Sequence, residues 1–84
     1  MPKYISVHTI ACMTRRQVQG LVKTVQEATE VKNHRVTASL LDGKMVCEWE
    51  AESKDQIEAY WKSANIHFDQ LLRIEYDSAD ATIQ

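Results

Sequence analysis

Residues that build tight loops and cross-links are scarce in this chain, which has two glycines, one proline and two cysteines among its 84 residues. Two glycines cannot build a phosphate-cradling loop or a nucleotide-binding fingerprint. Cys12 and Cys47 are too few and too far apart for a disulfide framework or a zinc knuckle. With 44% hydrophobic and 26% charged residues, the composition is that of a globular protein that folds without such aids.

The chain also lacks an excess of either charge. Its formal net charge is −2, with acidic and basic residues interspersed, so it carries no electrostatic footprint for nucleic acid or anionic lipid. No stretch approaches the roughly 20 apolar residues of a membrane-spanning helix. Residues 1–4 lead directly into an apparent strand and lack the apolar core of a signal peptide. We therefore expect a cytoplasmic protein without nucleic-acid or membrane partners.

The first regular pattern predicts a strand. Residues 3–9 alternate in polarity with a period of two, as in a half-buried β-strand. Ile5 and Val7 share one face, which the pattern assigns to the core. The other face carries Tyr4, Ser6 and His8. We expect this second face to be the uncovered one.

A helix is predicted next. Thr14 and Gln17 have the spacing of a capping box, in which each side chain accepts a hydrogen bond from the other residue's backbone amide. Apolar residues then recur at helical spacing, at Val18, Leu21, Val22 and Val25. The helix is expected to run to about Val31, with Lys32 and Asn33 supplying a basic last turn and a left-handed exit.

The strongest local signal is a hairpin over residues 34–51. Asp42 and Gly43 favour a two-residue turn of type I′, and this turn fixes how the two strands pair. On one face the register pairs Leu40 with Met45, Ala38 with Cys47 and Val36 with Trp49. On the other face it pairs Arg35 with Glu50, Thr37 with Glu48 and Ser39 with Val46. The apolar face is therefore predicted to be core, and the polar face to carry a cross-strand ion pair.

A second helix and a last strand follow the hairpin. Ser53 and Gln56 repeat the capping box, and Asn65 is expected to end the helix. The apolar stripe of this helix consists of Ile57, Tyr60, Trp61 and Ala64. Alternation returns over residues 71–77, which predicts the last strand. Residues 78–84 are expected to form a flexible tail or an arm that crosses a partner.

The elements follow the order βαββαβ, the split βαβ arrangement of ferredoxin-like folds. We therefore predict an α+β fold in which residues 1–84 form a single domain, with a four-stranded antiparallel sheet and two helices on one face. Right-handed crossovers place the first and third strands at the centre. The other face stays uncovered, and we expect a homodimer in which a second subunit lays its own sheet against it.

The uncovered face is where the sequence predicts chemistry. His8 is a candidate metal ligand there, because imidazole nitrogen and carboxylate oxygen both bind divalent transition ions. The carboxylates expected beside it are those of Glu48, Glu50 and Glu75. In an enzyme, His8 is instead the candidate general base, with Arg73 or Arg35 stabilising an enolate. An interface of ion pairs without any cavity is the third possibility.

Several stretches resemble a family of small bacterial proteins. They are Met1–Ile5, Val46–Ser53, Ala64–Asp69 and Leu72–Ile74. The family has no assigned function, and some members are described as nickel-binding or nickel-responsive. The resemblance implies a ferredoxin-like homodimer similar to the dimeric α/β-barrel group. It also implies nickel, or another divalent transition metal, as the ion to consider.

Two regions depart from the family's pattern. Typical members carry an aromatic residue, a histidine or arginine, and a tyrosine along the second strand, where this chain has Arg35, Thr37 and Ser39. They also carry a histidine in the second helix, where this chain has Tyr60. These positions are the ones best suited to bind metal, so His8 and the glutamates remain as the candidate ligands.

Two functions therefore stay open at this level. One is a dimeric, non-enzymatic protein that binds a metal ion or a small ligand between its sheets. The other is a cofactor-free oxygenase or isomerase of the dimeric α/β-barrel kind, acting on a small organic substrate. An enclosed, partly apolar pocket of about a few hundred Å³ between the sheets would favour the enzyme.

Overall fold

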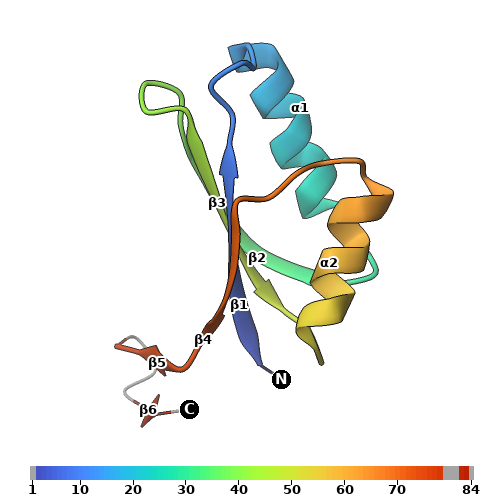
Figure 1. The fold of residues 1–84 in the computed structure, drawn as a ribbon, viewed down its shortest axis with the longest axis vertical. Helices are drawn as coiled ribbons and strands as arrows, with labels where there is room; N and C mark the ends of the chain where they lie inside the picture. Colours follow the sequence, from blue (N-terminus) through green and yellow to red (C-terminus); the bar gives the residue numbers. More distant parts are fainter. Residues whose placement is uncertain (1, 79–81, 84) are drawn as a thin grey trace.

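The computed structural model describes residues 2–78 and 82–83 of the chain. Its main sheet contains β1 (Lys3–Thr9), β2 (Lys32–Ser39), β3 (Lys44–Glu50) and β4 (Gln70–Ile74). The helices are α1 (Arg15–Gln26) and α2 (Lys54–Ser63). The strands pair antiparallel in the order β2-β3-β1-β4, and both helices lie on one side of the sheet (Figure 1). The predicted ferredoxin-like βαββαβ fold, with the first and third strands at the centre, is confirmed.

A second, two-stranded sheet follows β4. It pairs β5 (Tyr76–Asp77) with β6 (Thr82–Ile83), and it lies beyond the end of the main sheet (Figure 1). The tail predicted for residues 78–84 falls largely outside the described residues, which omit 79–81 and 84. Among the residues that the structure describes, no helix has the length and apolar content needed to cross a bilayer.

Helix α1 begins as predicted and ends earlier. Thr14 Oγ1 accepts a hydrogen bond from the amide of Gln17 at 3.2 Å, and Gln17 Oε1 accepts one from the amide of Thr14 at 2.8 Å, so the capping box is confirmed. The helix ends at Gln26, and the predicted extension to Val31 is wrong. Val31 is buried in the core, and from Lys32 onward the backbone pairs with β3 instead.

Helix α2 keeps its predicted exit but not its predicted cap. The side chain of Ser53 makes no cap hydrogen bond, and Gln56 Oε1 accepts from the amide of Glu52 at 3.0 Å. The predicted capping box of Ser53 and Gln56 is therefore wrong, because Gln56 bonds to the amide of Glu52 and not to that of Ser53. The helix ends just before Asn65, as predicted. Asn65 adopts a left-handed conformation with φ of 57°, and its amide donates to the carbonyl of Lys62.

The pairing of β2 with β3 is shifted by two residues from the predicted register. Val36 pairs with Cys47, and Ala38 pairs with Met45. Because the shift is even, the side chains that remain in β2 and β3 keep their predicted faces. Leu40, which was predicted to be core, instead lies in the loop and is exposed. Met45, Cys47 and Trp49 are fully buried, so the core face predicted for β3 is confirmed. The predicted ion pair of Arg35 with Glu50 is wrong, and Arg35 instead faces Glu48, with Nε and Oε2 separated by 3.9 Å.

A longer turn causes this shift. Residues 40–43 form the loop, in place of a two-residue Asp-Gly turn. Ser39 Oγ donates to Asp42 Oδ2 at 2.9 Å and accepts from the amide of Asp42 at 3.2 Å. The carbonyl of Gly43 accepts from the amide of Ile10 at 2.8 Å, which ties the loop to the connection between β1 and α1. These contacts stabilise the four-residue loop over the shorter one.

The two glycines are predicted to respond oppositely to alanine. Gly43 has φ of +68°, and a Cβ there would lie 2.9 Å from the Cβ of Ala11. A Cβ on Gly20, in the exposed part of α1, meets nothing within 4 Å. We expect Gly43→Ala to lower the free energy of unfolding by about 1–2 kcal/mol, and Gly20→Ala to raise it by about 0.5–1 kcal/mol. Urea denaturation measures both changes, and a Gly43→Ala variant as stable as the wild type would contradict the turn geometry.

Strand β1 faces the opposite way to the prediction. Tyr4, Ser6 and His8 point to the helices and are buried. Ile5 and Val7 lie on the uncovered face of the sheet, where they are half-buried. The predicted alternation is present, but the placement of His8 on the uncovered face is wrong. The physical reason is that Ser6 and His8 find hydrogen-bond partners inside the core, so their burial is not penalised.

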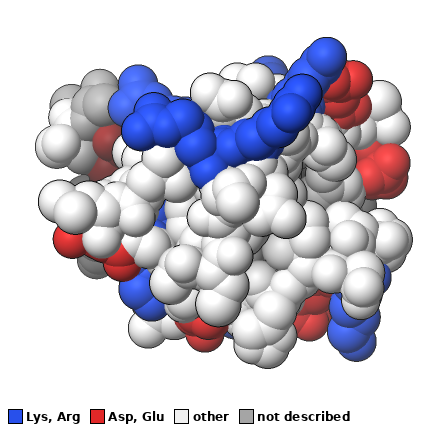
Figure 2. Space-filling model, turned by 90° about the horizontal axis from the view of Figure 1, so that it is seen from above, with Lys and Arg blue, Asp and Glu red and all other residues white. Residues whose placement is uncertain are grey.

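The end of the molecule that carries the hairpin loop exposes apolar side chains. Leu41 is 96% exposed, and Leu40 beside it is also exposed. Figure 2 looks onto this end of the molecule and shows a largely uncharged surface, crossed by Lys and Arg side chains and rimmed by acidic ones. Leu41 lies on this loop and not on the uncovered face of the sheet.

Candidate functional site

His8 lies at the centre of the layer between sheet and helices and is 1% exposed. The Trp61 ring of α2 packs against it, with ring centroids 4.2 Å apart. His8 Nδ1 lies 3.0 Å from the carbonyl oxygen of His67. Since a carbonyl oxygen can only accept, Nδ1 carries the proton and donates. The other ring nitrogen, Nε2, is therefore an acceptor in the neutral ring.

A chain of buried hydrogen bonds continues from His8 Nε2. The Ser6 hydroxyl lies 2.9 Å from this nitrogen and donates to it. Ser6 Oγ in turn accepts from Trp49 Nε1 at 2.8 Å. We call the chain from Trp49 through Ser6 and His8 to the His67 carbonyl the His8 network. It fixes one tautomer of His8 and uses both ring nitrogens.

The surroundings keep His8 uncharged. Burial lowers its pKa from the ordinary value of 6.5, while the hydrogen bond to the His67 carbonyl and the charge of Asp69 act in the opposite direction. Cys47 pairs with Ser6 across β1 and β3, and burial raises the pKa of its thiol to about 12. At neutral pH the core therefore contains a neutral imidazole whose two nitrogens are both hydrogen-bonded, and a thiol that is not in the thiolate form that binds metals.

The structure does not bring the predicted metal ligands together. Glu48 and Glu50 lie on the uncovered face of the sheet, opposite to His8. Glu75 is exposed in the short connection between β4 and β5. Among the described residues, no group of three or more histidine, cysteine, aspartate or glutamate side chains is arranged to hold a metal ion. The named residues thus do not fit a nickel or other divalent centre, and metal binding stays a prediction.

The residues named for an enzyme are also separated. Arg35 lies on the uncovered face, so the sheet stands between it and His8. Arg73 pairs with Tyr4 and is exposed at the other end of β1. A general base needs a free lone pair within reach of its substrate, and the lone pair of His8 Nε2 is already used by Ser6. The arrangement therefore does not support proton abstraction by His8.

The uncovered face instead presents an apolar strip, which the sequence reasoning missed. It consists of Ile5, Val7, Val46, Leu72 and Ile74, from the two central strands and β4. Ile5 pairs with Leu72, and Val7 pairs with Val46, so these side chains are neighbours on one face. Leu72 is 51% exposed. The signal that could have revealed the strip is the apolar Val46, which the predicted register already placed among polar residues.

Charged side chains surround this apolar strip. At one end, His34 Nε2 lies 3.2 Å from Glu50 Oε1, and this hydrogen bond lowers the pKa of Glu50. At the other end, Lys44 Nζ lies 3.5 Å from Asp69 Oδ2. The hydrogen bond from Thr9 is the main reason that the pKa of Asp69 is lowered, with Lys44 contributing. The face is thus largely apolar along β1 and β4, and carries charges of both signs along β2 and β3 and at its ends.

A hollow of about 180 Å³ lies at the end of this face nearest β5. Its lining consists of Lys3, His34, Glu48, Trp49, Ile74 and Asp77. His34 was not expected to belong to any site, because a single histidine at the start of a strand carries no spacing signal. The hollow adjoins the apolar strip through Ile74.

Comparison with known proteins supports the fold and goes no further. No protein-family model matches the sequence, and no curated protein matches it. A solved structure, described as the crystal structure analysis of SCO4226 from Streptomyces coelicolor A3(2), superposes with a TM-score of 0.69. Its sequence is 16% identical, and the match covers 89% of this chain and 98% of that one. The likeness therefore shows a shared small α/β fold.

Proposed function

We propose that this chain acts as a homodimeric, non-enzymatic binding domain, in which two sheets pack face to face through the apolar strip. The observation that carries the proposal is the strip itself, an apolar band bordered by charged side chains on the face that the helices leave uncovered. Burying apolar surface stabilises by about 25 cal/mol per Å². A domain of this size gains proportionately more from such burial, because it hides little of its own surface.

The rim charges fit an interface between identical copies. A two-fold interface places the same patch of each subunit against the other, so each patch has to be complementary to itself. The Arg35–Glu48 pair supplies both signs of charge on the uncovered face, and so does the Lys44–Asp69 pair. An apolar centre with a polar rim is also the usual anatomy of a specific interface. The resemblance to a family of ferredoxin-like homodimers supports the same assembly.

The hollow near β5 is the place that we assign to a small ligand in the dimer. Its lining contains charged and imidazole groups beside the apolar Ile74. A second sheet laid over the strip would cover the open side of this hollow. A small polar molecule fits a space of about 180 Å³ better than a large organic substrate does. This favours the binding domain over the oxygenase or isomerase.

Replacing Leu72 by glutamate is expected to dissociate the dimer. The substitution places a charge in the middle of the apolar strip, where the partner's sheet would have to desolvate it. We expect the dimer dissociation constant to rise about a hundredfold or more, which corresponds to about 2.7 kcal/mol. Sedimentation equilibrium across a range of protein concentrations measures this constant for the wild type and the variant.

Leu41→Glu is the matched control for this experiment. Leu41 is 96% exposed on the hairpin loop, so the same chemical change there leaves the sheet face intact. The control variant should dimerise like the wild type. A wild type that stays monomeric throughout the concentration range would overturn the proposal. So would a Leu41→Glu variant that dissociates as readily as Leu72→Glu, because the loop and not the strip would then form the interface.

A further inference from the structure

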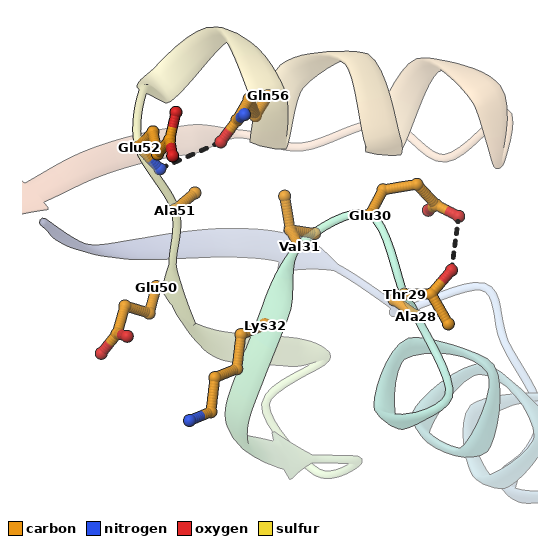
Figure 3. Close-up of a pocket in the computed structure, with 9 residues that line it drawn as sticks. All are labelled: Ala28, Thr29, Glu30, Val31, Lys32, Glu50, Ala51, Glu52 and Gln56. Atoms are coloured by element: carbon orange, nitrogen blue, oxygen red, sulfur yellow. Dashed lines mark hydrogen bonds between the residues drawn. The ribbon is translucent and has the colours of Figure 1, made fainter. Parts of the chain in front are cut away.

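Two hollows on the helix side of the molecule join into one groove. The first has a volume of about 450 Å³ and lies between residues 28–32, the end of β3 and the start of α2 (Figure 3). The second has a volume of about 390 Å³ and follows α2 to Ser63. Glu30 and Gln56 line both hollows, so the two are continuous. We call the joined hollows the α2 groove.

The lining of the α2 groove is apolar where it is deepest and acidic at its sides. Val31, Ala51 and Tyr60 line it and are all buried. Figure 3 shows Glu30 on one side of the first hollow and Glu52 on the other, with Val31 and Ala51 between them. Such a lining can cover a short hydrocarbon chain while holding a charged group at each end.

The charge of the groove is negative. Its lining contains three carboxylates, Glu30, Glu50 and Glu52, and one ammonium group, Lys32. Glu50 is already hydrogen-bonded to His34. Glu30 accepts a hydrogen bond of 3.3 Å from its neighbour Thr29. Glu30 and Glu52 are the carboxylates that we assign to a ligand, because they stand on the two sides of the apolar lining (Figure 3). Glu30 and Tyr60 both line the second hollow, and the pKa of Tyr60 is raised first by burial and then by the charge of Glu30.

We propose that the α2 groove binds an aliphatic diamine. One ammonium group pairs with Glu30 over the Tyr60 ring, and the other pairs with Glu52. The methylene groups between them cover Val31 and Ala51. Ammonium–carboxylate hydrogen bonds are among the strong ones in proteins, and an ammonium group is also attracted to the face of a tyrosine ring. Glu30 and Glu52 lie outside the apolar strip, and Glu50, which borders both regions, is not assigned to the diamine, so the site does not depend on the proposed dimer.

Titration calorimetry with 1,4-diaminobutane tests the proposal. The wild type is expected to bind the diamine, and Glu30→Gln is expected to bind it about tenfold more weakly, since the variant loses one charged partner. Glu58→Gln is the matched control, because Glu58 lies on α2 and does not line the groove. The control should change the affinity less than about twofold. The neutral 1,4-butanediol, which has the same length, should not bind.

Three results would overturn the diamine site. The first is a wild type that releases no heat with the diamine at concentrations well above those of ordinary metabolites. The second is equal binding of the diol, which would remove the role of charge. The third is equal weakening by Glu30→Gln and Glu58→Gln, which would show a general effect of net charge. Circular dichroism of each variant checks that the substitutions at the exposed Glu30 and the half-buried Glu58 leave the fold intact.

Discussion

Replacing His8 by alanine is expected to lower the free energy of unfolding by about 2–4 kcal/mol. The substitution leaves the His67 carbonyl and the Ser6 hydroxyl without their partner inside the core. It also opens a cavity beside the Trp61 ring, which packs against the imidazole. Urea unfolding followed by tryptophan fluorescence measures the change, since Trp49 belongs to the His8 network and Trp61 packs against it.

Two further variants distinguish the effect of losing the His8 network from the effect of losing any histidine. Ser6→Ala removes the central hydroxyl and is expected to cost about 1–3 kcal/mol, because Trp49 Nε1 then lacks its acceptor. His34→Ala removes a surface histidine that pairs with Glu50, and it should change stability by less than about 0.5 kcal/mol. If His8→Ala had the same free energy of unfolding as His34→Ala, the buried network would not stabilise the core.

Acid is expected to destabilise the protein at pH values well above those that titrate its carboxylates. Burial lowers the pKa of His8 in the folded state, so the unfolded chain binds a proton more readily than the folded one. The contribution of the neutral His8 is therefore complete above the unfolded pKa of 6.5 and is lost progressively as the pH falls below it. Melting temperatures measured between about pH 8 and pH 4.5 follow this loss.

The His8→Ala variant is the control for the acid effect. It should lose most of the decline in melting temperature between pH 6.5 and pH 4.5, because the group that titrates there is gone. Glu50 and Asp69 also have lowered pKa values, but their stabilisation is lost only as the pH falls below the ordinary values of 4.5 and 3.8. An unchanged decline in the variant would assign the acid sensitivity to another group.

The elements that could be predicted from the sequence are those whose cause is local. The capping box of Thr14 and Gln17 and the left-handed Asn65 each depend on residues within a few positions of one another. The order of elements then limits the topology to a small number of arrangements. The early end of α1 was missed because it depends on tertiary contacts, the burial of Val31 and the pairing of Lys32 with β3.

The orientation of β1 could not be predicted from its alternation alone. A period of two shows that the faces differ, but it does not say which face is covered. Polarity favoured Ile5 and Val7 as core residues. The acceptor that makes the burial of His8 possible is the carbonyl of His67, 59 residues away in the sequence. Such a partner becomes visible only when the chain is folded, and every site prediction that used His8 inherited this error.

The candidate sites were hidden for a related reason. The apolar strip depends on which face of β1 is uncovered, so it could not be recognised while Ile5 was assigned to the core. The α2 groove takes Glu30 from one connection and Glu52 from another, 22 positions later by their residue numbers. No local spacing joins these residues, since the fold alone places them on the two sides of one hollow.

The loop between β2 and β3 has a role beyond closing a turn. Two alignments of this hairpin, the one with a two-residue turn and the one that forms, assign the strand side chains that they share to the same faces, because they differ by an even number of residues. The hydrophobic pattern alone does not select the alignment that forms, because the shorter turn would also place Leu40 on the core face. The observed register is selected by the two hydrogen bonds between Ser39 and Asp42 and by the hydrogen bond from the Ile10 amide to the Gly43 carbonyl. The sequence of the hairpin is thus compatible with an alternative register, and a few polar contacts at the loop make the observed register the more stable one.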